Sequence, residues 1–130
     1  MIGLDTNVLV RYLVRDDEQQ AEAARVLLES LTPERPGFVC REVIVELVWV
    51  LERAYGFTPV QVSKVLLELA ATESLVIEEA GDVARAAVRY RVSGGGFSDL
   101  MILAAAERSA AHPLYTFDKK AARIDGVSLL

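Results

Sequence analysis

The chain has 130 residues, of which 52% are hydrophobic and 25% are charged, so its composition is that of one folded domain rather than of a disordered or fibrous chain. Its 19 acidic residues outnumber its 14 basic residues, and the formal net charge of -5 excludes binding to nucleic acid or anionic lipid through the charge of the whole molecule. A single cysteine and a single histidine exclude a disulfide framework and a zinc site built from several cysteines or histidines.

Short apolar strands alternate with helices along the chain. Strands are predicted where a short apolar run is bounded by turn residues, at residues 1–4, 38–40, 75–77, 114–117 and 127–130. Helices are predicted where apolar residues recur at helical spacing behind a capping residue, at about residues 7–13, 17–31, 41–55, 59–72, 82–92 and 99–111. A short helical turn is predicted from residue 119.

Several of these helices begin at a recognisable capping residue. Thr6 or Asn7 is suited to cap the first helix, and residues 58–61 form a capping box with a proline at the first helical position. Asp82 and Ser98 are expected to cap the last two long helices. The caps and the apolar periodicity therefore predict the same helices.

The alternation of strands and helices predicts an α/β fold over residues 1–130, as one domain with a mostly parallel sheet of four or five short strands and helices on both faces. The longest apolar run, residues 100–106, has seven residues, whereas a membrane span needs about 20. The first residues lack the pattern of a signal peptide. We therefore expect a cytoplasmic protein without membrane contact.

Four carboxylates are expected at the edge of the sheet where the strands end, which is where ligands bind in such folds. Asp5 closes the first strand and Asp118 closes the strand at 114–117. Asp99 opens the helix after a run of three glycines, and Glu46 lies one turn into the helix at 41–55. Clustered carboxylates stay ionised together only around a cation, and oxygen ligands without histidine or cysteine suit Mg²⁺ or Mn²⁺.

Each acid also has a simpler interpretation. Asp5 is placed to cap the first helix and Asp118 to cap the turn that follows its strand, and Asp99 is favourable in a first helical turn. Glu46 lies opposite the apolar face of its helix, as a solvated residue would. The three glycines at 94–96 lack the spacing and lysine of a phosphate-binding loop and are interpreted as a flexible loop.

Basic residues flank the proposed site. Most of them are arginines, which bind phosphate through paired hydrogen bonds. The candidates for contacts with RNA phosphates are Arg11, Arg41 and Lys119.

Four motifs in order resemble those of the PIN-domain ribonucleases, and in particular the VapC toxins of type II toxin–antitoxin pairs. These motifs are MIGLDTN at the start, VIVELVWVL in the middle, FSDLMILAAA later and YTFDKK near the end. The resemblance covers nearly the whole chain and implies a PIN-like three-layer fold. It also implies an acidic quartet that binds Mg²⁺ or Mn²⁺ and carries out catalysis, made of Asp5, Glu46, Asp99 and Asp118.

The same resemblance implies further residues and partners. Thr6, Asn7 and Thr116 match small polar residues that line and orient the site. The family implies cleavage of single-stranded or looped RNA by a homodimer, which a small cognate antitoxin neutralises by inserting a segment across the acidic groove. Hydrolysis by water would leave a 5′-phosphate and a 3′-hydroxyl, with Glu46 or Asp118 as the proton acceptor.

Three other functions are compatible with parts of this pattern. A haloacid-dehalogenase-like phosphatase needs a second aspartate two residues after the first, where this chain has Asn7. A receiver-type signalling domain expects neighbouring acids after the first strand, which this chain lacks. A catalytically silent PIN scaffold that binds RNA or protein stays open, although the presence of all four acids counts against it.

Overall fold

The computed structural model describes residues 1–93 and 95–130; Gly94, which belongs to the glycine run predicted as a flexible loop, lies outside the described residues. The strands are β1 (Ile2–Gly3), β2 (Gly37–Val39), β3 (Leu75–Ile77), β4 (Leu114–Thr116) and β5 (Val127–Leu129). The helices are α1 (Thr6–Val14), α2 (Glu18–Glu29), α3 (Arg41–Tyr55), α4 (Pro59–Ala70), α5 (Ala80–Ser93) and α6 (Phe97–Arg108), with a 3-10 turn η1 (Ala121–Arg123). The α/β fold class is confirmed, with the predicted alternation of elements.

Local capping explains several helix boundaries. The capping box that begins α4 is present, with the Thr58 and Gln61 side chains and backbones bonded reciprocally. Gly56 ends α3 with φ of 65°, a left-handed conformation that glycine adopts without strain. The prediction of a helix at residues 41–55 is therefore confirmed to the residue.

Three predicted caps are wrong. Asp5, rather than Thr6 or Asn7, is the N-cap of α1. Asp82 lies inside the first turn of α5, where its buried carboxylate binds arginines instead of the helix backbone. Gly96 precedes α6 in the cap position, so Ser98 is already helical.

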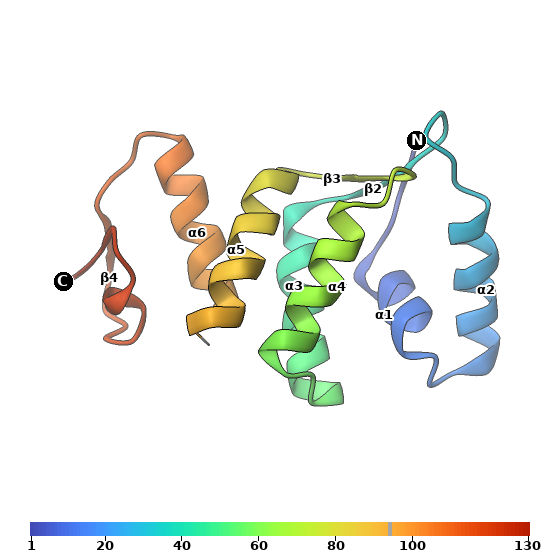
Figure 1. Ribbon diagram of the computed structural model, residues 1–130, viewed down its shortest axis with the longest axis horizontal. Coiled ribbons are helices and arrows are strands. Elements are labelled where there is room, and N and C mark those ends of the chain that lie inside the picture. Colours follow the sequence, from blue (N-terminus) through green and yellow to red (C-terminus); the bar gives the residue numbers. More distant parts are fainter. Residues whose placement is uncertain (94) are drawn as a thin grey trace.

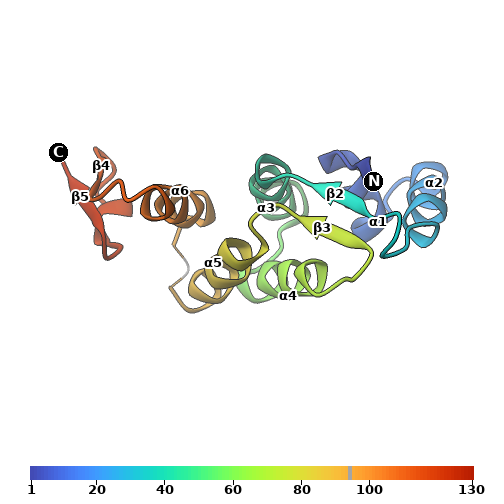
Figure 2. The same ribbon diagram turned by 90° about the horizontal axis from the view of Figure 1, so that it is seen from above.

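The five strands are divided between two parallel sheets, whereas the sequence predicted one sheet of four to five strands. One sheet has the order β1-β2-β3, with Ile2 opposite Gly37 and Phe38 opposite Val76. The other contains only β4 and β5, with Tyr115 opposite Ser128. The division arises because α6 packs beside α5 and carries β4 and β5 away from β1, as Figures 1 and 2 show.

The main hydrophobic core lies between the three-stranded sheet and the helices around it. Ile44, Leu47 and Leu51 of α3 are fully buried there, together with Leu66 of α4 and Leu9 of α1. Burying each such side chain contributes roughly 1.5–3 kcal/mol to folding. No helix in the described part of the chain is long and apolar enough to cross a membrane.

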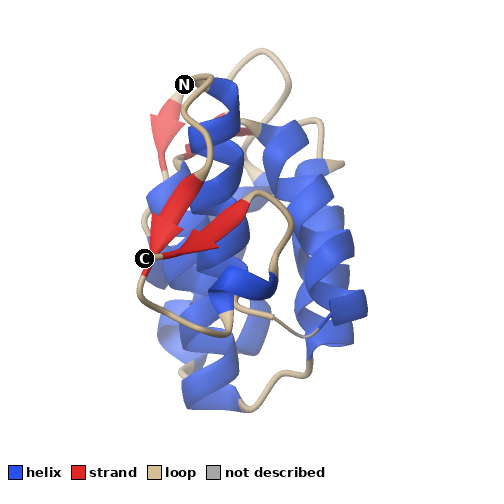
Figure 3. Cartoon of the chain, turned by 90° about the vertical axis from the view of Figure 1, so that its left-hand side faces the viewer, coloured by secondary structure: helices blue, strands red, loops and turns tan. Residues whose placement is uncertain are grey.

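Residues 97–130, which comprise α6, β4, η1 and β5, form a projection that we name the C-terminal arm; residues 1–93 are the body. The arm has a small core of its own, in which Leu103, Ala121 and Val127 are buried outside the main cluster. Figure 3 shows its two strands side by side at this end of the molecule. A sheet of two strands is at best marginally stable alone, so β4 and β5 depend on the rest of the arm for support.

The arm is held to the body through α6. Phe97 meets Tyr90 of α5 edge-to-face, with ring centroids 5.9 Å apart. Arg41 of α3 donates a hydrogen bond of 2.7 Å from Nη2 to the Met101 carbonyl oxygen. Arg108 pairs with the buried Asp82 of α5, which also lies 3.3 Å from Arg41. These contacts fix the direction in which the arm leaves the body.

Candidate active site

Asp5 lies at the junction of β1 and α1. Its Oδ1 accepts a hydrogen bond of 2.8 Å from the Thr6 amide, so the simpler role of helix cap is real. The carboxylate is nevertheless exposed, whereas the neighbouring Thr6 is buried. Thr6 Oγ1 has no hydrogen-bond partner among the described residues, which is unusual for a buried hydroxyl.

Asn7 follows on the first turn of α1, where it is exposed and lines a shallow cavity with Arg11 and Gln20. It belongs to the same junction as Asp5, and its role in lining the site stays a prediction.

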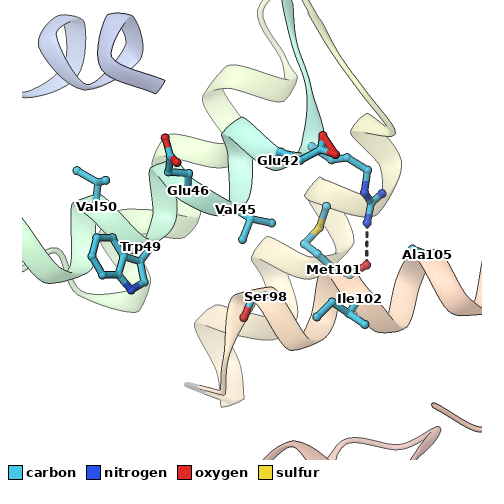
Figure 4. Close-up of a pocket in the computed structure, with 10 residues that line it drawn as sticks. Glu42, Val45, Glu46, Trp49, Val50, Ser98, Met101, Ile102 and Ala105 are labelled. Atoms are coloured by element: carbon cyan, nitrogen blue, oxygen red, sulfur yellow. Dashed lines mark hydrogen bonds between the residues drawn. The ribbon is translucent and has the colours of Figure 1, made fainter. Parts of the chain in front are cut away.

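Glu46 lies on the exposed side of α3 and lines a cavity of about 700 Å³ between α3 and α6. Figure 4 shows Val45 and Trp49 on α3 across from Ser98 and Ile102 on α6, with the Glu46 carboxylate directed away from α6. The rest of the cavity is largely apolar. This carboxylate therefore borders an apolar groove whose other wall is the helix that carries Asp99.

Asp99 and Asp118 are brought near each other inside the arm. Burial raises the pKa of Asp99, and the charge of Asp118 raises it further. Asp118 is exposed and caps the turn after β4, because its Oδ1 accepts hydrogen bonds from the amides of Lys120 (2.8 Å) and Ala121 (3.1 Å). Thr116 Oγ1 accepts a hydrogen bond of 3.0 Å from the Asp118 amide and so helps to orient this acid.

The four acids do not converge within one chain, and the expectation that they would is wrong. Asp5 and Glu46 belong to the body, whereas Asp99 and Asp118 belong to the arm. Among residues 1–93 and 95–130, no group of three or more His, Cys, Asp and Glu side chains is close enough to hold a metal ion. The donor atoms have the right chemistry for Mg²⁺ or Mn²⁺, but a single chain does not assemble them into a metal site.

Two of the three residues predicted to bind phosphate form hydrogen bonds with other residues of the protein. Arg11 donates hydrogen bonds to Gln20 and Asp16, at 2.6 and 3.2 Å, and Arg41 bonds Asp82 and the Met101 carbonyl. These contacts give both arginines a structural role. Lys119 lies on the exposed turn next to Asp118, as an RNA-contacting residue requires.

Sequence reasoning missed the part that Gly96 plays. A Cβ atom at this position would lie 2.5 Å from Asp99 Oδ2, so the absence of a side chain leaves room for the carboxylate. The signal available in the sequence was the spacing: a residue in the cap position faces the side chain three residues later. The glycine run was interpreted only as a flexible connection.

Comparison of the sequence with models of known protein families identifies the family to which this domain belongs. The model of the PIN domain matches residues 2–127. The chain belongs to the PIN-domain family. This membership indicates nuclease activity, which in PIN domains typically depends on divalent metal ions. Neither the curated proteins nor the solved structures gave a match to this chain.

Proposed function

We propose that this PIN domain, spanning residues 1–130, is an endoribonuclease that hydrolyses RNA phosphodiester bonds with Mg²⁺ or Mn²⁺ through its acidic quartet. The observation that carries the proposal is the pair Asp99 and Asp118. Burial and the neighbouring charge both oppose ionisation of Asp99, as its raised pKa records. Such a pair is unfavourable for the protein alone and becomes favourable when a cation lies beside it.

The chemistry that suits these residues is hydrolysis by water. A divalent ion held by these carboxylates would offset the charge of a phosphate and make water a better nucleophile. Water attacks the phosphorus atom and the bond from phosphorus to the 3′-oxygen breaks. The 3′-oxygen takes a proton from solvent, so the products carry a 5′-phosphate and a 3′-hydroxyl. Glu46 or Asp118 accepts the proton from the attacking water. Lys119, next to Asp118, is proposed to contact a neighbouring phosphate.

We further propose that the protein is the toxin of a toxin–antitoxin pair, acting in the cytoplasm as a homodimer. The order of its four motifs supports this role. The groove between α3 and α6 supports an antitoxin partner, because its apolar residues Val45, Trp49 and Ile102 lie beside Glu46. An apolar segment of a small antitoxin seated there would cover this acid and block access of RNA to it.

The direct test is cleavage of a labelled single-stranded RNA by the purified protein. We expect cleavage with Mg²⁺ or Mn²⁺ and none in excess chelator, because the carboxylates need the cation to act on a charged phosphate. A parallel reaction without added metal ion is the control and should leave the RNA intact. Full cleavage in chelator would contradict the proposal.

A silent PIN scaffold that binds RNA or protein is the second candidate. The separation of the two pairs of acids within one chain favours it, because a binding module does not need them to meet. The same assay distinguishes the two functions: a scaffold would bind the RNA and leave it intact under every metal condition.

The position of Gly96 makes a specific prediction about activity. In Gly96→Ala, the new methyl group would displace the Asp99 carboxylate, so we expect cleavage to fall roughly tenfold to a hundredfold. The backbone there has φ of -65°, which alanine adopts freely, so the melting temperature should change little. Gly95→Ala is the matched control, because its Cβ would lie no closer than 3.5 Å to Ser93 Oγ. Equal activities of the two variants would contradict this role of Gly96.

A further inference from the structure

The three-stranded sheet ends in an open edge at β1. The Ile2 and Leu4 amides donate hydrogen bonds to the Pro36 and Phe38 carbonyl oxygens, at 3.1 and 2.9 Å. Successive peptide groups of a strand point to opposite sides, so the peptide of Gly3 faces away from β2. β1 has no neighbour on that side within the described residues. Such an edge carries unpaired backbone N–H and C=O groups and is a template for another strand.

The arm ends in a matching open edge at β4. The Leu114 amide donates a hydrogen bond to the Gly126 carbonyl oxygen, and the Leu130 amide donates one to the Thr116 carbonyl oxygen. The peptide of Tyr115 therefore faces away from β5. The aromatic side chains on and after this strand are exposed, Tyr115 by 62% and Phe117 by 78%. A strand beside β4 would support a two-stranded sheet that is marginal alone.

Parallel pairing of β1 with β4 would join the two halves of the acidic quartet. Asp5 follows β1 and Asp118 follows β4, so pairing these strands in parallel places both acids at the same end of one sheet, in the order β3-β2-β1-β4-β5. Asp99 already lies near Asp118 and would arrive with it. The buried Thr6 hydroxyl, which has no partner among the described residues, lies at this same junction.

The chain's own β4 is held away from its β1. Figure 2 places β4 and β5 at one end of the molecule, with α6, α5 and α3 between them and the N-terminus. Only three residues connect α5 to α6, so Ser93 and Phe97 can lie at most about 14 Å apart. Folding the arm back onto β1 would break the contacts of Phe97, Met101 and Arg108 with the body. A second copy offers the same open edge without that loss.

We propose that two copies of this chain exchange their C-terminal arms, so that β4 of each copy pairs with β1 of the other. Each site then combines Asp5 and Glu46 of one copy with Asp99 and Asp118 of its partner. In a dimer with two-fold symmetry, both open edges are paired and both sites are complete. Two-fold symmetry is the usual symmetry of such exchanges. The catalytic consequence rests on the proposed function, whereas the strand pairing stands on the open edges alone.

Disulfide cross-linking tests the strand pairing without any assay of activity. One tagged chain carries Gly3→Cys and a second, differently tagged chain carries Tyr115→Cys, both in a Cys40→Ser background. A side chain at position 3 meets no atom within 4 Å, and Cys40 is the N-cap of α3, a position that serine suits. We expect mild oxidation to join the two chains covalently. Val26→Cys on α2, also exposed, replaces Gly3→Cys in the control and should give no cross-link.

A single chain that carries both cysteines distinguishes strand pairing between two copies from strand pairing within one chain. The exchange predicts covalent dimers on a non-reducing gel, even at low protein concentration. Monomers with an internal disulfide would show that each arm pairs with its own body, and the absence of any cross-link would show that the strands do not pair. Either of these results would overturn the exchange.

A mixed dimer tests whether the exchanged arms complete the site. Asp5→Asn and Asp99→Asn chains with different tags are co-expressed and purified through both tags. One of the two sites in such a dimer would contain four native acids, so we expect about half of the wild-type activity, although each variant alone is inactive. An inactive mixed dimer beside an active wild type would overturn the shared site. If the wild type cleaves no RNA, the proposed function fails, and cross-linking alone decides the exchange.

Discussion

Replacing Asp99 by asparagine is expected to abolish RNA cleavage while leaving the protein folded. The variant removes one negative charge from the proposed cation site, which should lower kcat/KM by at least about a hundredfold. The raised pKa of Asp99 shows that its ionised form is unfavourable in the folded protein without a cation. We therefore expect the melting temperature in chelator to stay the same or to rise.

The control for this variant is another acid of the same charge far from the proposed site. Glu68→Gln changes an exposed residue of α4 and should leave both cleavage and melting temperature unchanged. Cleavage by Asp99→Asn at the wild-type rate would remove this residue from the site. A strongly lowered melting temperature would instead assign Asp99 a structural role.

Asp82→Ala is expected to cause a large loss of stability. Asp82 is buried and binds Arg41, Arg85 and Arg108, which belong to three helices. Removing this carboxylate leaves the half-buried Arg41 without its ion pair and loosens α6 from α5. We expect the free energy of unfolding to fall by about 2–3 kcal/mol in urea denaturation near neutral pH. Arg85→Ala is the control: its side chain is largely exposed, and it should cost less than about 1 kcal/mol.

The stabilisation by Asp82 should also decrease as the pH falls. Burial opposes ionisation of Asp82, but hydrogen bonds from Arg108 and Arg41 outweigh burial and hold its pKa below the ordinary value. A carboxylate with a lowered pKa stabilises the fold above its unfolded-state pKa, and the effect is lost as the pH falls through the folded-state value. The stability difference between wild type and Asp82→Ala should therefore be full at pH 6 and shrink below about pH 4. A difference that grows in acid would contradict this account of the cluster.

The helices were predictable because their signals are local. The capping box at Thr58 and the apolar stripe of residues 41–55 specify a helix from neighbours along the chain. Asp82 was misjudged for the same reason: an aspartate before an apolar stretch is typical of a cap, and only packing brings Arg41 and Arg108 to it. Local sequence patterns do not identify partners that are distant in the chain.

The acids of the candidate site could be identified from the sequence, but their arrangement in space could not. Asp5 and Asp118 were expected together because both end parallel strands, and that rule assumes that the strands share a sheet. Apolar periodicity identifies each strand but not which edges pair, so the division into two sheets was not foreseen. The docking of α6 on α5 depends on side-chain contacts such as Phe97 with Tyr90.

The measurement that tests the central claim most directly is the chemistry of the ends left on cleaved RNA. Hydrolysis by water at an acidic, cation-dependent site predicts fragments with a 5′-phosphate and a 3′-hydroxyl, formed by the wild type and not by Asp99→Asn. Fragments that carry a 2′,3′-cyclic phosphate and a 5′-hydroxyl would show attack by the RNA's own 2′-hydroxyl and would contradict the account.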